Sequence, residues 1–325
     1  MNFTQLNKNG AVEGFCLIKT VEQKMTAKGS VYLDMTLTDS DGEINAKLWD
    51  YKAESHGTFS PNDLIKIRGT IQPFNDAQQL RIERIRPVSE SDNVRIEDFV
   101  PSAGFSGEAM FNELMSVADG FRDEELKLLV TTLLNEYRDK LIYWPAAFRL
   151  HHAIRGGLLY HTLSILRMAQ SVASIYPFID SDLLFAGVIL HDIAKTQEFD
   201  VASTGIASGY TADGNLIGHL VRGAMAVEKC GRELGISDNT LMLVEHMIIS
   251  HHGEPEFGAA VRPMFLEAEI LSSLDTLDAK IYEIEQACRS VEPGEFTPRQ
   301  WALDNRKLYN HDRNHADFTA DLMNK

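Results

Sequence analysis

The sequence predicts a multidomain α+β protein in which a five-stranded OB-fold β-barrel precedes an all-α domain. Residues 12–87 contain five short runs of alternating apolar and polar residues, whereas apolar residues recur at helical spacing from residue 107 onward. The segment between them is rich in Ser, Pro, Gly and acidic residues, which is typical of a linker. We therefore expect domains at residues 1–88 and 107–325, joined by a linker at 89–106.

The first domain is predicted strand by strand. Turn signals such as Lys28-Gly29 and Asp41-Gly42 separate the runs, and a short helical piece is expected at Tyr51–Gly57. Five strands with one insertion after the third strand is the order expected of an OB-fold. The expected strands are Val12–Val21, Val31–Thr38, Glu43–Trp49, Leu64–Ile71 and Gln78–Ile85.

The second domain shows helical periodicity, first in Met110, Leu114 and Val117. Residues suited to N-capping precede two of its segments, namely Asp180 or Ser181 and, further on, Ser237. The run Thr297-Pro298-Arg299-Gln300 has a capping-box pattern that predicts a short helix. Further helices are expected at 157–175, 181–191, 215–234, 238–250 and 264–288.

The net charge of −16 is unevenly distributed along the 325 residues. Residues 1–87 carry 11 Lys/Arg and 11 Asp/Glu, so the remaining 20 Lys/Arg and 36 Asp/Glu lie in residues 88–325. A neutral segment can still present a basic face, whereas a strongly acidic domain repels phosphate unless metal ions intervene.

Compartment signals favour a cytoplasmic protein with no membrane partner. The longest apolar run, Leu183–Leu190, is too short to span a bilayer. The N-terminal residues lack the pattern of a signal peptide. Three cysteines without a CxxC pair indicate free thiols in a reducing environment. Whether the chain forms a homo-oligomer is left open.

Histidines carry the chemistry of the second domain. Only His56 of the 11 histidines precedes residue 151. Imidazole and carboxylate together suit divalent metals such as Mn, Fe, Co, Ni and Zn.

The adjacent residues of the doublet His191-Asp192 would point about 100° apart on a regular helix. They can share one metal where a helix ends, or the Asp can bridge two metals. His251-His252 poses the same problem, so two doublets favour a binuclear centre. The informative set, which we expect near helix ends, is His161, His191, Asp192, His219, His246, His251, His252 and Asp275.

Longer motifs around these residues are similar to a known family. The order His161, His191-Asp192, Asp275 reproduces the H…HD…D signature of the HD phosphohydrolase superfamily. More narrowly, the chain resembles the YhaM-like 3′-to-5′ exoribonucleases of bacteria, which place an OB-fold before an HD domain. The motifs are HHAIRGGLLYHT at 151–162, GNLIGH at 214–219, EHMIISHHGEPEFG at 245–258, LSSLDTLDAK at 271–280 and GEFTPRQWALDNRKLY at 294–309.

The resemblance implies a ligand set for two divalent ions, manganese first, with Fe, Co, Ni or Mg as alternatives. Asp192 would bridge the ions and Lys195 would face the substrate phosphate, and these two are the expected catalytic residues. His151, His152 and His246 are expected on the phosphate side, although His246 could instead support a ligand. The implied ligands are His161, His191, Asp192 and Asp275, with His219, His251 and His252 for the second ion.

The resemblance also implies the reaction. Two divalent ions would lower the pKa of a water between them, and the products from the 3′ end of single-stranded RNA or DNA would be nucleoside 5′-monophosphates. The barrel would hold the strand through stacking aromatic residues and cations. Its expected contacts are Tyr32, Trp49, Lys47 and Arg68, with Phe15, Phe74, Lys19, Lys24, Lys28 and Arg81 as further candidates.

Two other functions stay open. One is an HD phosphodiesterase or phosphatase that acts on a nucleotide or a cyclic nucleotide. Gly253-Glu254-Pro255 after the histidine doublet differs from the GYP-type continuation of cyclic-di-GMP phosphodiesterases, which argues against that subgroup. The other is a nucleic-acid-binding protein without catalysis, against which the complete ligand set argues.

Overall fold

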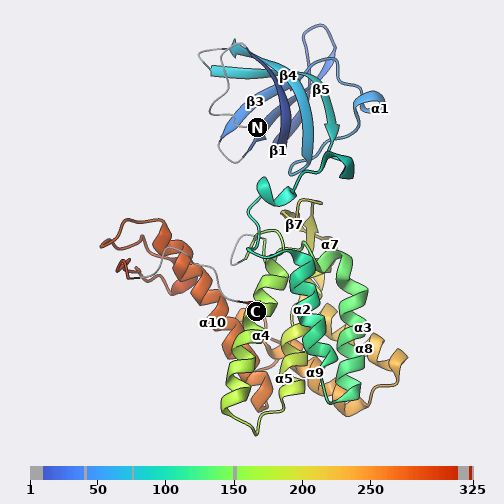
Figure 1. Cartoon of the computed structure of the whole chain (residues 1–325), viewed down its shortest axis with the longest axis vertical. Coiled ribbons are helices and arrows are strands. Elements are labelled where there is room, and N and C mark those ends of the chain that lie inside the picture. Colours follow the sequence, from blue (N-terminus) through green and yellow to red (C-terminus); the bar gives the residue numbers. More distant parts are fainter. Residues whose placement is uncertain (1–9, 40–41, 75–76, 149–151, 314–321, 324–325) are drawn as a thin grey trace. The chain divides into compact units, whose positions relative to one another are not determined.

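The computed structural model describes residues 10–39, 42–74, 77–148, 152–313 and 322–323. The chain divides into two compact units, shown in Figure 1. The first comprises residues 1–102 together with 201–208, and the second comprises residues 103–200 and 209–325. The short segment 201–208, which is far from the barrel strands in the sequence, therefore belongs with the N-terminal unit.

The first unit is a closed five-stranded barrel with the strand order β1-β2-β3-β5-β4. The pair β3–β5 is parallel and all the others are antiparallel, with helix α1 (Ala53–His56) between β3 and β4. This is the OB-fold topology, so the fold predicted for the N-terminal domain is confirmed. The strands are β1 (Ala11–Met25), β2 (Val31–Thr38), β3 (Glu43–Leu48), β4 (Leu64–Phe74) and β5 (Ala77–Pro87).

Strand β1 extends beyond its predicted end at Val21 because it serves two neighbours. Its first half pairs with β4, and its second half pairs with β2 as far as Met25 opposite Val31. The added residues are exposed, so they carry no apolar alternation that the sequence could reveal.

The barrel is filled by the inward-facing residues of every strand, among them Met35, Leu37, Ile65, Ile67 and Leu80. Gly69 lies at a register shift between β4 and β5. A Cβ atom there would lie 2.3 Å from the carbonyl oxygen of Arg81, so only glycine allows the strands to approach at this point.

Residues 89–102 of the predicted linker belong to the first unit, and residues 103–106 belong to the second. The linker contains two 3-10 turns, η1 (Glu90–Asp92) and η2 (Ile96–Asp98). Its apolar residues pack with Leu17 and Leu64 of the barrel and with Ile206 of the 201–208 segment. Burial of this small cluster anchors the linker to the barrel.

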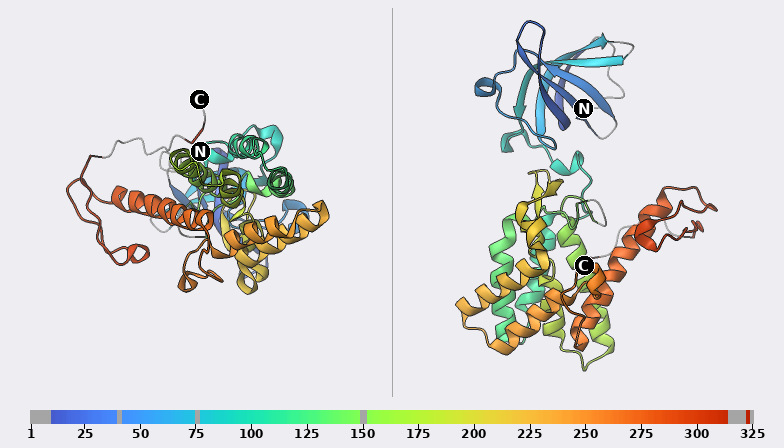
Figure 2. Two further views of the ribbon diagram at one scale, coloured as in Figure 1. Left: turned by 90° about the horizontal axis from the view of Figure 1, so that it is seen from below. Right: turned by 180° about the vertical axis from the view of Figure 1, so that it is seen from behind.

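The second unit is a bundle of helices in which α4, α5, α8, α9 and α10 surround the histidine site. Asp180 and Ser237 cap α5 and α9 as predicted. Figure 2 shows the C-terminal part of α10 extending away from the other helices. The helices are α2 (Gly107–Asp119), α3 (Glu124–Leu141), α4 (Gly157–Ile175), α5 (Ser181–Leu190), α6 (Lys195–Glu198), α7 (Ala212–Leu216), α8 (Gly218–Leu234), α9 (Asp238–Ser250) and α10 (Leu266–Arg289), with the 3-10 turns η3 (Pro255–Phe257) and η4 (Trp301–Leu303).

Three details differ from the sequence expectations. The single helix predicted at 215–234 is two helices, because Gly218 has φ 75° between α7 and α8. A hairpin of β6 (Phe199–Val201) and β7 (Ala207–Tyr210) was not predicted. The capping box at Thr297 is wrong, since the Thr297 hydroxyl donates to the Pro298 carbonyl and only the 3-10 turn η4 follows. Within the described residues, no helix has the length and apolar character of a membrane span.

Candidate metal centre and nucleic-acid interface

The His191-Asp192 doublet lies where a helix ends. Helix α5 stops at Leu190 and His191 is its C-cap, so the chain turns directly after the imidazole. As a result both side chains reach one point, with His191 Nε2 3.3 Å from Asp192 Oδ2. Helix α9 ends in the same way at His251. The expectation that the two doublets lie at helix ends is therefore confirmed.

The two oxygens of the Asp192 carboxylate face different groups of histidines. Oδ2 lies 3.7 Å from His161 Nε2 as well as near His191. Oδ1 lies 3.4 Å from His219 Nε2 and 3.6 Å from His251 Nε2. Asp192 therefore stands between two sets of nitrogen ligands. It is 2% exposed, so it is also shielded from water.

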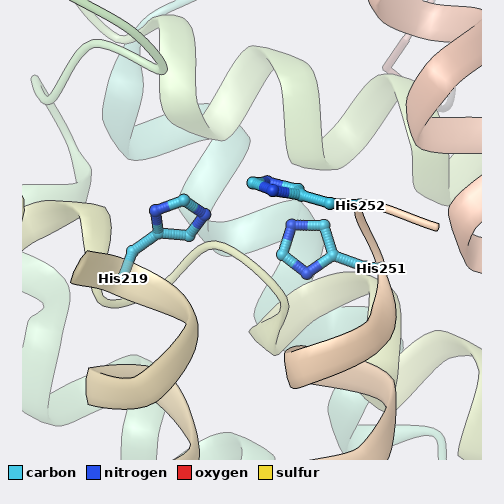
Figure 3. A group of neighbouring side chains, drawn as sticks. All are labelled: His219, His251 and His252. Carbon is cyan, nitrogen blue, oxygen red and sulfur yellow. The ribbon is translucent and has the colours of Figure 1, made fainter. Parts of the chain in front are cut away.

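One set consists of three histidines from two elements, drawn in Figure 3. His219 comes from the first turn of α8, and His251 and His252 follow the end of α9. One ring nitrogen of each lies within 4.8 Å of the others. The figure shows the three rings gathered around a common space, an arrangement that suits a metal of borderline softness.

The other set is built around His161 in the second turn of α4. Its Nε2 lies 3.1 Å from Asp275 Oδ1 and, together with His191 and Asp192, it forms a second cluster of metal-ligating type. The expectation that Asp275 lies near a helix end is wrong, because it is in the middle of α10. The carboxylate reaches the site because α10 packs against α4 and α5.

Outer hydrogen bonds orient these rings. Nδ1 of His191, His251 and His252 donates to a backbone carbonyl, namely that of Val188, Ile248 and Phe257 respectively. A carbonyl only accepts, so Nδ1 carries the proton and the lone pair of Nε2 is left for a ligand. Such outer partners fix the tautomer and raise ligand basicity in metal sites.

Two carboxylates that the sequence analysis missed do the same for the remaining histidines. Glu198 Oε2 lies 2.7 Å from His219 Nδ1, and Asp278 Oδ2 accepts a 2.8 Å hydrogen bond from His161 Nδ1. Asp278 follows Asp275 by one helical turn, which is a signal that spacing could have supplied. Nothing in the sequence around Glu198 distinguishes it from a surface glutamate.

Buried polar atoms without partners show that a cation fits here. Asp192 Oδ1, His219 Nε2 and His251 Nε2 are buried and lack a hydrogen-bond partner in the described part of the chain. Leaving such atoms unsatisfied costs about 1–3 kcal/mol each. Asp192 Oδ1 lies 3.4 Å from the His219 nitrogen and 3.6 Å from the His251 nitrogen. One divalent ion among them would satisfy all three.

The electrostatics favour neutral ligands beside a positive charge. Burial lowers the pKa of His251 to about 3 and also lowers that of His252, so both rings are neutral at pH 7. Burial opposes protonation of His161 as well, but Asp275 and Asp278 outweigh it and raise that pKa to about 10. The two carboxylates thus require a positive charge at His161, which a divalent ion would supply.

Lys195 contacts Asp192 directly. Its Nζ lies 2.7 Å from Asp192 Oδ2, and the side chain is 8% exposed. Burial tends to raise the pKa of Asp192, but Lys195 and His191 outweigh it and hold that pKa well below its usual range. Asp192 is therefore a carboxylate throughout the physiological pH range.

The residues expected on the phosphate side are placed differently. His151 lies outside the described residues. His152 is 2% exposed and its Nε2 is 3.0 Å from Asp278, so it supports the carboxylate behind His161 instead of facing the phosphate side. His246 Nε2 accepts from the Met264 backbone, which makes it a loop anchor between α9 and α10.

On the barrel, the expected nucleic-acid contacts divide into two groups. Lys47 Nζ lies 5.2, 5.5 and 5.7 Å from the ring centres of Tyr32, Trp49 and Phe74. Trp49 is 38% exposed and Phe74 52%. We call these four residues the aromatic cluster. Arg68 is not part of it, and lies in the middle of β4 opposite Arg84.

Comparison with known proteins agrees with this architecture. The family model described as HD domain matches residues 158–280. The 3′-5′ exoribonuclease YhaM of Bacillus licheniformis is 38% identical over 92% of this chain and 94% of its own length. The protein of that name from Bacillus subtilis is 36% identical over the same shares. Among solved structures, the second OB-fold domain of replication protein A from Methanococcus maripaludis is 14% identical over 28% of this chain and 95% of that chain, with a TM-score of 0.23. Because the chain is 36–38% identical to the two exoribonucleases over 92% of its length, it belongs to the YhaM 3′-5′ exoribonuclease family.

Proposed function

We propose that this protein is a metal-dependent 3′-to-5′ exoribonuclease that releases nucleoside 5′-monophosphates from single-stranded RNA, and that also accepts single-stranded DNA. The observation that carries the proposal is the Asp192 carboxylate, whose two oxygens face two separate histidine sets. Membership of the YhaM family supports the choice of an RNA end as substrate.

The residues that would hold the ions divide at Asp192. The mixture of imidazoles and carboxylates suits several divalent ions, and manganese is our first choice because the resemblance to the YhaM family implies it. When bound, the two ions would supply an activated water and positive charge for the phosphoryl oxygens. One ion would be held by His161, His191, Asp192 and Asp275, and the other by Asp192, His219, His251 and His252.

The surrounding residues balance the charge of Asp192 and orient the histidine ligands. Lys195 neutralises part of the Asp192 charge at 2.7 Å and adds positive charge where the strand's phosphate would approach. Glu198 and Asp278 hold His219 and His161 in fixed orientations. A fixed geometry matters because small displacements of catalytic groups cost large factors in rate.

The strand needs room beside the ligands. A hollow of about 400 Å³ opens at His252 and is also lined by Ser272, Ser273 and Thr276, next to Asp275. We assign it to the terminal nucleotide. The barrel at residues 1–88 would bind the strand and the helices of 107–325 would cleave it, with 89–106 between them. Free thiols at Cys16, Cys230 and Cys288 agree with a cytoplasmic location.

A degradation assay tests the proposal. Full-length protein is incubated with 5′-labelled single-stranded RNA and Mn²⁺, with and without a chelator. We expect a ladder that shortens from the 3′ end, that is abolished by the chelator and that returns with excess Mn²⁺. Turnover of a small nucleotide with intact RNA would favour the phosphodiesterase function instead. Binding of RNA without any turnover would identify a non-catalytic binding protein.

A further inference from the structure

The outer surface of the barrel carries cations that its fold does not pair. Arg81 and Arg84 on β5 and Arg68 on β4 are exposed, and none forms an ion pair with any residue that the structure describes. Other barrel cations differ. Lys24 pairs with Asp34 at 2.9 Å, and Arg86 pairs with Asp92 at 2.6 Å.

Strand register places the unpaired cations side by side. Arg68 lies directly opposite Arg84 across the β4–β5 pair, and like charges in that position are destabilising. Arg81 lies beside Lys47 across the β3–β5 pair. Because Leu80 and Ile82 point into the barrel core, Arg81 between them points outward. We call Lys47, Arg81, Arg84 and Arg68 the β5 track.

The β5 track connects the aromatic cluster with a hollow on the barrel surface. It starts in the aromatic cluster, because Lys47 belongs to both. It ends in a hollow of about 520 Å³ lined by Arg68, Arg84, Lys66 and Arg86. Two carboxylates also line this hollow. Glu83 accepts from Thr70, and Glu13 lies opposite Arg68 across the β1–β4 pair and 3.5 Å from Lys66. The four cations outnumber these two carboxylates, so the hollow keeps a net positive charge.

We propose that the β5 track binds the phosphodiester backbone of the single strand whose bases stack on the aromatic cluster. This inference rests on the proposed function and adds a path for the substrate along the barrel. Three residues of a strand span about 10 Å, so Arg81 and Arg84 would reach two different phosphates of one strand. An anion between Arg68 and Arg84 would also relieve their mutual repulsion.

The nearby aromatic side chains are the reason to choose nucleic acid over other polyanions. Base stacking on aromatic residues combined with cations along the backbone is the usual means of holding a single strand without sequence preference. Tyr32 and Trp49 already lie with ring centres 4.6 Å apart, next to the first cation of the track.

The test measures RNA affinity of the full-length chain against salt. A fluorescein-labelled oligouridine is titrated with protein in chelator, so that it stays intact, at several salt concentrations. For Arg68→Gln/Arg84→Gln we expect affinity to fall about tenfold at low salt, and the slope of log K against log salt to shrink by about 1.4, as for two lost phosphate contacts. Arg68→Lys/Arg84→Lys should restore most of the affinity.

The matched control is Arg138→Gln/Arg232→Gln. It removes the same charge from α3 and α8, where Glu108 and Glu228 already pair the two arginines, and it should bind RNA as the unaltered chain does. Equal losses in both double variants, or no loss in either, would overturn the track. Failure of the unaltered chain to bind the oligouridine would instead refute the proposed function. Thermal melting of each variant checks that its fold is intact.

Discussion

Replacing Asp192 with Ala should abolish RNA degradation while RNA binding is retained. Among the residues that the structure describes, Asp192 is the one carboxylate that contacts both histidine sets, so its loss should remove the link between the two ions. Loss of several kcal/mol of transition-state stabilisation corresponds to a rate reduction of at least about a thousandfold. The measurement is the rate of 3′-end shortening, with affinity for the same RNA measured in parallel.

A control for folding is needed because Lys195 is buried against Asp192. Removing one partner of a buried ion pair costs about 3–5 kcal/mol, since the other charge is left unpaired. Asp192→Ala/Lys195→Met removes both charges and should melt at a higher temperature than the single variant, yet be equally inactive. Full activity in Asp192→Ala would refute the assignment of the metal site.

Deleting residues 1–90 should weaken RNA binding far more than it affects small substrates. The deletion removes the aromatic cluster, and each stacked base is worth about 1–3 kcal/mol. Affinity for oligouridine should therefore fall at least about a hundredfold. Hydrolysis of bis(p-nitrophenyl) phosphate needs only the metal centre and should be retained.

The deletion cuts through a small apolar cluster. It removes Leu17 and Leu64 and leaves Val100 with Ile206, so thermal melting must show that the shortened chain is folded. Trp49→Ala in the full-length chain is the matched point variant and should lower affinity in the same direction. Unchanged RNA affinity after the deletion would show that the helical unit alone holds the strand.

The barrel was predictable because its strands alternate. Residues such as Ile65, Ile67, Leu80 and Ile82 are buried with exposed or half-buried neighbours between them, and that pattern is local. The β6–β7 hairpin was not predictable, because strands of three and four residues are too short for alternation to identify them. Its turn residue Ile206 packs with the first unit, so its burial depends on residues far away in the sequence.

The residue types of the metal ligands were predictable from the sequence. The residues that hydrogen-bond to those ligands were less predictable. The doublets indicated helix ends on steric grounds, and α5 and α9 end there. The supporting roles of Glu198 and His152 could not be predicted, because their partners are set by how the helices pack. The same holds for Arg68, whose separation from the aromatic cluster follows from strand register. Asp278 could have been found from its spacing of one helical turn after Asp275.

The most direct test of a binuclear centre is anomalous diffraction from crystals grown with Mn²⁺. Two manganese peaks are expected per chain, one on each side of the Asp192 carboxylate. One peak should lie among His161, His191 and Asp275, and the other among His219, His251 and His252. A single peak, or none, in crystals of protein that degrades RNA would contradict the two-metal site.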